Sequence, residues 1–202
     1  MKKIIVTMLL PILFSSFISI SKPGLTDAER KFAVDHLKQT QSDLVEAVQG
    51  LSEAQLNWKP AADKWSVLEC VQHITLASAA LFQMGQGALK QPNDSALKSG
   101  VADDQLIKMV EDRSHKVQTS EPLRPVNSPY HTLSETLQAF NADRNKLIDY
   151  VQATDDDLRN HIAKMPFGNI DMYQLLLMIS AHTNRHTQQL NEVKADPNFP
   201  KQ

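Results

Sequence analysis

Residues 179–190 read Ile179-Ser-Ala-His-Thr-Asn-Arg-His-Thr-Gln-Gln-Leu190, and this stretch predicts a helix that carries a functional site on its inner face. His182 and His186 are four residues apart, which places both imidazoles on the same side of a helix, about 6 Å apart at Cβ. One metal ion can contact both rings at that separation. A third histidine, His73, lies far upstream in a stretch with a comparable helical pattern.

The composition indicates an all-α protein with a substantial core. The chain has 202 residues, of which 42% are hydrophobic, and this length suits one domain or one domain with a tail. Only 6 residues are glycine, and Ala, Leu, Gln and Lys are frequent, which favours helices. The formal net charge of −2 excludes a broad basic face, so we expect no nucleic-acid partner.

The N-terminus has the pattern of a secretory signal peptide. Residues 1–3 are a short basic start, residues 4–20 are mostly apolar, and small residues precede a possible cut after Ser21. We expect residues 1–21 to be removed and the protein to be exported, either to a periplasm or as a secreted chain. The alternative is that this segment stays uncleaved as a membrane anchor, and we expect membrane attachment only in that case. It is disfavoured because Pro11 interrupts an apolar run that is already short.

Three capping boxes mark helix starts. In each box a Ser or Thr and a Glu three residues later satisfy each other's end of the helix. Gly50 ends the first helix, and Trp65, just before the second, is interpreted as a hydrophobic staple onto Cys70. We expect four long helices, over about 26–49, 66–90, 132–151 and 170–194.

A long connection separates the second and third helices. It runs from about 91 to 131, with an extra helix expected over 103–118 and a proline-rich extended stretch after it. A connection of this length can return the chain to its starting end, so that the second helix runs parallel to the third and antiparallel to the fourth. We therefore predict a four-helix bundle with a crossover over residues 22–195, followed by a C-terminal tail over 196–202.

This topology brings the three histidines to one depth. His73 lies seven residues after Ser66, about 10 Å into the second helix, and His186 lies eight residues before Lys194, about 12 Å from the other end of the fourth. In antiparallel helices these depths coincide. The spacing therefore predicts that His73, His182 and His186 converge.

Three converging histidines predict a divalent transition metal, with Zn, Ni, Fe and Mn all compatible with neutral imidazole ligands. The remaining positions on the metal would hold water or substrate. Gln189, Gln72 and Glu69 are near enough in sequence to orient the rings, although the capping box already explains Glu69. The alternative is that the three histidines are merely hydrogen-bonded or exposed. We expect the remaining histidines, His36, His115, His131 and His161, to be solvated. We expect the single cysteine, Cys70, to be a buried small hydrophobe.

These motifs resemble the DinB-like superfamily, the damage-inducible helical-bundle family. Trp65-Ser-Val-Leu-Glu-Cys-Val-Gln-His73 is similar to its Trp-Ser…His element, and Ala181-His-Thr-Asn-Arg-His-Thr-Gln-Gln189 to its last-helix His-x-x-x-His-x-x-Gln element. The segment Leu51-Ser-Glu-Ala-Gln-Leu-Asn-Trp-Lys-Pro60 is similar to the link between its first two helices. The resemblance covers about residues 25–195.

The resemblance implies a left-handed crossover bundle with a divalent metal on His73, His182 and His186. It also implies metal-dependent chemistry of the kind found in family transferases and isomerases that use low-molecular-weight thiols. We keep two hypotheses: an exported metal-dependent hydrolase or thiol-dependent transferase, and a non-catalytic bundle that binds a metal or a ligand. The residues identify neither the small-molecule substrate nor the catalytic groups, and they leave a homodimer open.

Overall fold

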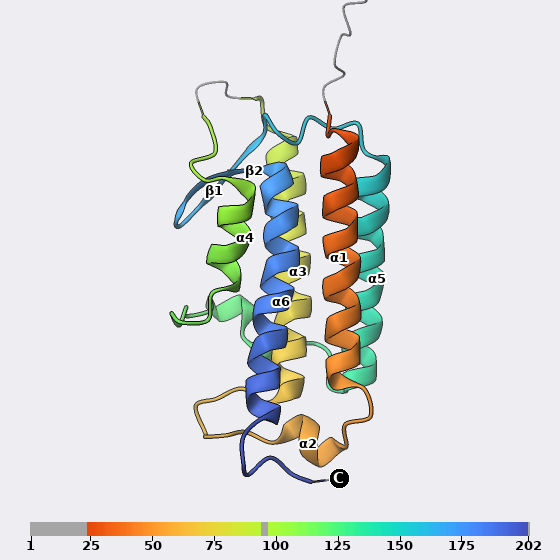
Figure 1. The fold of residues 1–202 in the computed structure, drawn as a ribbon, viewed down its shortest axis with the longest axis vertical. Coiled ribbons are helices and arrows are strands. Elements are labelled where there is room, and N and C mark those ends of the chain that lie inside the picture. Colours follow the sequence, from red (N-terminus) through yellow and green to blue (C-terminus); the bar gives the residue numbers. More distant parts are fainter. Residues whose placement is uncertain (1–23, 94–96, 202) are drawn as a thin grey trace, which may run out of the picture.

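Four long helices form the molecule in a computed structural model of the chain, which describes residues 24–93 and 97–201 (Figure 1). The expected signal peptide, 1–21, lies outside the described residues. The long helices are α1 (Asp27–Val48), α3 (Val67–Leu89), α5 (Leu133–Ala153) and α6 (Met172–Lys194).

The four helices pack as the crossover predicts. Both α1 and α3 pack against α5 and α6, so α1 lies diagonally opposite α3, and α5 lies diagonally opposite α6. Near one end of the bundle His73 of α3 contacts His186 of α6, and near the other end Gly85 of α3 lies beside Met172 of α6. These two contacts show that α3 and α6 are antiparallel. The predicted four-helix bundle with a crossover is confirmed.

The helix starts are set locally by capping boxes. The three predicted boxes are present at α1, α3 and α5. Two more begin the short α2 (Glu53–Asn57) and α6, where Asp171 pairs with Gln174. Gly50, with φ of 74°, follows the end of α1 in the left-handed conformation that glycine tolerates best.

The crossover is less helical than expected at its centre and more helical near its end. Helix α4 (Asp103–Glu111) stops well before residue 118 because the carboxylate of Asp112 accepts the backbone N–H and the hydroxyl of Ser114. The proline-rich stretch is not simply extended, since it forms two short 3₁₀ turns. These are η1 (Glu121–Leu123) and η2 (Pro125–Asn127).

A small β-hairpin precedes the last helix and was not predicted. Strands β1 (Ile162–Met165) and β2 (Gly168–Asp171) pair antiparallel, with Met165 opposite Gly168. The hairpin delays the start of α6 to Met172, two residues later than expected. It also places Asp171 as the capping residue of that helix.

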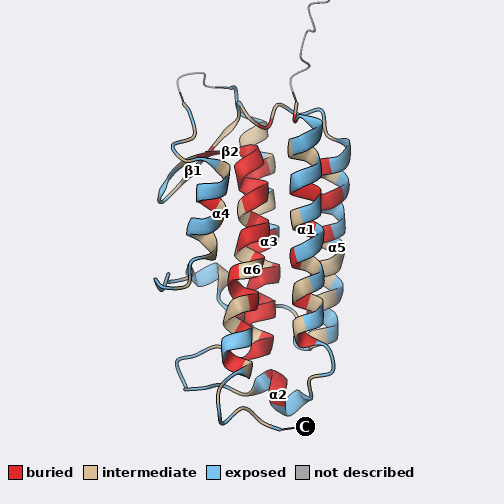
Figure 2. Ribbon diagram, viewed as in Figure 1, coloured by how far each residue is buried: buried red, intermediate tan, exposed pale blue. Residues whose placement is uncertain are grey.

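The core runs along the inner faces of the long helices (Figure 2). Helix α3 is apolar and long enough to cross a membrane, but 56% of its most apolar window is buried inside the bundle, as in the core helix of a soluble fold. Residues 196–201 fold back onto α2: the ring of Phe199 packs edge-on against Trp58, and Gln55 donates to the carbonyl of Pro200.

Candidate metal centre

Three histidines converge between α3 and α6, as the helix depths predict. His73 comes from the first half of α3, His182 from the middle of α6 and His186 from the second half of α6. One potential ligand nitrogen from each ring lies within 4.8 Å of the other two. Among the described residues no aspartate, glutamate or cysteine joins this group, so the donor set is all imidazole.

Hydrogen bonds at Nδ1 fix the orientation of two of the rings. The Nδ1 of His73 lies 2.8 Å from the carbonyl oxygen of Leu123 in η1, and the Nδ1 of His186 lies 2.8 Å from Oε1 of Gln189. Both oxygens can only accept, so each Nδ1 must carry the proton. Each Nε2 then presents a lone pair. This is the usual arrangement of metal-binding histidines, in which a second group fixes the tautomer.

The spacing of two ring nitrogens also fits a shared ion. The Nε2 atoms of His182 and His186 are 3.2 Å apart. Two nitrogens that each lie about 2.1 Å from one ion are separated by roughly 3.0 to 3.4 Å for ligand angles between octahedral and tetrahedral. The rings therefore have a separation that one metal ion can bridge.

Burial keeps the three rings in the neutral form that binds metals. Desolvation, followed by the nearby His73 and Arg185, lowers the pKa of His182 to about 3. Desolvation also lowers the pKa of His186 well below its usual value and, more modestly, that of His73. At pH 7 all three imidazoles are therefore uncharged.

Trp65 forms one wall of the site. Its ring centre lies 4.8 Å from that of His73 and 5.9 Å from that of His186. The sequence predicted only a staple at this position, because the residue before a helix cap has no fixed side-chain direction in a sequence pattern. The structure adds an aromatic surface against the histidine cluster.

Around the histidines, Gln189 has the predicted orienting role and Gln72 does not. The amide of Gln72 instead donates to the carbonyl of Tyr130, and Glu69 caps its own helix and pairs with Lys59. The sequence missed Arg113, which lies in the irregular segment after α4. Its guanidinium donates to Oε1 of Gln189 at 3.3 Å and makes two bonds of 2.7 Å to the carboxylate of Glu192.

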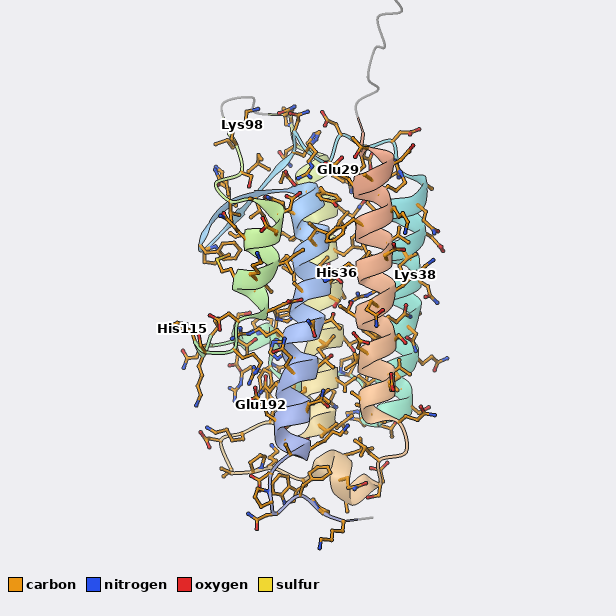
Figure 3. All side chains as sticks on the ribbon, viewed as in Figure 1. Glu29, His36, Lys38, Lys98, His115 and Glu192 are labelled. Atoms are coloured by element: carbon orange, nitrogen blue, oxygen red, sulfur yellow. The ribbon has the colours of Figure 1, made fainter. Side chains whose placement is uncertain are left out.

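The segment that follows α4 therefore lies against the site. In Figure 3 the labelled His115 lies in that segment and the labelled Glu192 lies near the end of α6, on the same side of the bundle. Arg185 ties the segment down by donating to the carbonyl of His115 at 2.7 Å. The crossover thus supplies both Leu123 and Arg113 to the surroundings of the cluster.

The remaining histidines and the cysteine stay outside the cluster. His115 and His131 are exposed, as expected, and His161 is half-buried. The expectation for His36 was wrong: its ring stacks on Phe32 and burial lowers its pKa. The thiol of Cys70 is buried as predicted, and burial raises its pKa, so it is a core side chain and no nucleophile.

Comparison with known proteins agrees with this fold. The family model of the DinB superfamily matches residues 36–190, and the chain therefore belongs to the DinB superfamily. The matched range includes His73, His182 and His186.

Two proteins of Bacillus subtilis are similar to this chain, one in sequence and one in fold. The uncharacterized protein YuaE of strain 168 is 23% identical over 148 residues, which cover 73% of this chain and 88% of YuaE. The solved structure of YfiT, described as "a probable metal-dependent hydrolase with an unusual four-helix bundle topology", aligns with a TM-score of 0.56. The alignment covers 85% of this chain and 89% of YfiT at 12% identity, which is a likeness of fold.

Proposed function

We propose that this protein is an exported metal-dependent hydrolase in which His73, His182 and His186 bind one divalent transition metal. The observation that carries the proposal is the fixed orientation of the rings. Leu123 and Gln189 hold two Nδ1 protons, and burial keeps all three imidazoles neutral. Zn, Ni, Fe and Mn all accept such a donor set.

A divalent metal held by His73, His182 and His186 would activate water as a nucleophile near neutral pH. The chain's own groups provide the setting for this chemistry. His73 and His186 are oriented by their hydrogen-bond partners, and the Trp65 ring packs against both imidazoles on one side. Arg113 extends the hydrogen-bonded chain from Gln189 to the surface at Glu192.

Two arguments favour water over a thiol as the nucleophile. The relative YfiT is described as a hydrolase, and the shared fold supports the same class of reaction here. Export, which rests on the basic start and apolar run of residues 1–21, would also remove the chain from the cytoplasm, where low-molecular-weight thiols are abundant.

The first experiment is elemental analysis of protein purified from its native compartment without chelators. We expect one transition metal per chain, its loss in His73→Ala, and its retention in the matched control His131→Ala, which removes an exposed histidine. Wild-type protein without metal would overturn the metal site.

The second experiment tests turnover. The metal-loaded protein should hydrolyse at least one member of a panel of esters and amides, and His73→Ala should not. Metal without turnover in that panel would favour a non-catalytic metal-binding bundle, and turnover only with thiol conjugates would favour a transferase.

Export is tested by N-terminal sequencing of the mature protein. The sequence should begin at Lys22, and a protein that still begins at Met1 would contradict cleavage.

A further inference from the structure

A cavity lies between α3 and α5, and none of the three clustered histidines lines it. It has a volume of about 240 Å³. The buried residues Thr75, Ser78 and Arg144 form its polar floor. The other lining residues are Phe140 and Leu147, which are buried, and Ala79, Phe82, Gln83, Asp143 and Lys146 nearer the rim.

Arg144 is a buried cation in the centre of the bundle. Its side chain is 2% exposed and donates to the carbonyl of Leu37 at 3.2 Å, to Oγ1 of Thr40 at 3.0 Å and to Oγ1 of Thr183 at 2.6 Å. All three acceptors are neutral. The Nε atom of Arg144 is buried and has no hydrogen-bond partner among the described residues.

No carboxylate within the described part of the chain compensates this charge. Burial alone lowers the pKa of Arg144 to about 9, and no acidic group counteracts it. Asp143 at the rim pairs instead with Lys146 at 3.2 Å. The guanidinium also lies over the ring of Phe140, 5.1 Å from its centre. Because a buried ion without a counter-ion costs several kcal/mol, a guanidinium in this setting is expected to have an anionic partner.

Ser78 adds a second unused donor to the same cavity. It is 9% exposed, and its Oγ has no partner among the described residues. A guanidinium N–H and a hydroxyl on one cavity floor match the two oxygens of a carboxylate. The apolar walls at Phe82, Phe140 and Leu147 suit a hydrocarbon chain.

From these contacts we infer that the cavity binds a short-chain organic monocarboxylate, with its carboxylate against Arg144 and Ser78 and its chain along Phe82 and Leu147. The size agrees with a short chain, since about 240 Å³ is small for a pocket that binds an organic ligand. Pockets for larger organic ligands begin at roughly 300 Å³. The inference does not depend on the metal or on hydrolysis.

The test compares hexanoate with hexanamide, which has the same chain and no charge. Binding to the full chain is measured by calorimetry and by the thermal shift at constant ionic strength. We expect saturable binding of hexanoate at millimolar concentration and none of hexanamide. Arg144→Met should weaken binding on the order of 10- to 100-fold, and Ser78→Ala by about fivefold. The control Lys38→Met removes an exposed positive charge from α1, outside the cavity, and should leave binding unchanged.

Two further variants keep the inference falsifiable if Arg144→Met does not fold. Ala79→Phe fills the rim of the cavity, leaves Arg144 in place and should abolish binding in a folded protein. His73→Ala should bind hexanoate normally, which separates this cavity from the proposed metal site. Loss of binding in His73→Ala, equal binding of hexanoate and hexanamide, or no binding to the wild type would each overturn the inference and leave Arg144 as a structural clamp only.

Discussion

The Nδ1 atom of His186 donates to the side-chain carbonyl of Gln189, 2.8 Å away and almost one turn further along α6. This short contact fixes the tautomer of a buried imidazole from within its own helix. It also connects the ring to Arg113, which donates to the same oxygen. The geometry of the histidine cluster therefore depends on a residue that would not contact the metal.

Gln189→Leu should weaken metal binding while leaving the fold intact. The substitution removes the acceptor of the His186 Nδ1 proton, and loss of such a partner typically costs 10- to 100-fold in metal affinity. Competition with a chromophoric chelator measures the affinity, and Gln189→Glu, which keeps an acceptor, should recover most of it. Gln138→Leu, on the exposed face of α5, is the matched control. An unchanged affinity in Gln189→Leu would show that the hydrogen bond has no role in metal binding.

Trp65 should report metal binding by its fluorescence. The chain has 2 tryptophans, and Trp65 packs on the rings of His73 and His186, whereas Trp58 packs against Phe199. Added Co²⁺ or Ni²⁺ should quench the wild type and Trp58→Phe to saturation at one equivalent. Trp65→Phe should lose this response. Quenching that persists in Trp65→Phe would mean that the ion binds elsewhere.

Two glycines of α3 should respond oppositely to alanine. At Gly85 an added Cβ would lie 2.4 Å from Cε of Met172 and 2.8 Å from Cδ2 of Leu175, whereas Gly87 has open space. Gly87→Ala should stabilise the protein by about 1 kcal/mol through helix propensity. Gly85→Ala has the same gain in helix propensity, but crowding against α6 should lower the stability by about 1 to 3 kcal/mol. Urea unfolding measures both, and a higher midpoint for Gly85→Ala than for Gly87→Ala would contradict the close helix packing.

The stability of the bundle should fall in acid partly because of Asp103. Arg159 contacts the carboxylates of Glu29, Asp103 and Asp171 at 2.6, 2.6 and 3.0 Å. The hydrogen bond from Arg159 lowers the pKa of Asp103 below its ordinary value of 3.8. A carboxyl with a lowered pKa stabilises the fold above its ordinary pKa, and this contribution is lost as the pH falls through the folded value.

Asp103→Asn should therefore be less stable than the wild type at pH 7 and should lose less stability between about pH 5 and pH 2. The free energy of unfolding, measured in urea across this range, tests the prediction. Asp149→Asn, an exposed residue on α5, should follow the wild-type curve. Parallel curves for Asp103→Asn and the wild type would show that the pair with Arg159 contributes nothing. Asp171 has a smaller effect of opposite sign. Burial raises its pKa, so its protonation in acid favours the folded state.

The regular parts of the fold and the histidine cluster could be predicted because a helix has a fixed rise. Once the capping boxes set the helix starts, the depths of His73 and His186 followed from counting residues, and only the direction of the helices had to be inferred. The short hairpin before α6 was not predicted from the sequence. Its strands have four residues each, and its turn, at Pro166 and Phe167, has none of the Asn-Gly or Asp-Gly signals of tight turns.

The irregular parts of the site could not be predicted. Leu123 contributes a backbone carbonyl, for which residue type is no guide, and Arg113 lies in a segment without periodicity. Trp65 follows a loop whose path decides where the ring points. Arg144 was missed for a different reason: charged side chains are almost never fully buried, so the helical pattern assigns such a residue to the surface.

Five of the helices, α1, α2, α3, α5 and α6, each begin with a complete capping box made by residues only three apart. Each helix therefore carries its start signal within four consecutive residues and needs no distant partner to define where it begins. Local signals of this kind reduce the conformational search during folding, as in other helical proteins rich in short-range contacts. They also free the connecting segments to change in length and sequence during evolution, so the crossover can diversify its surface while the histidines keep their depth.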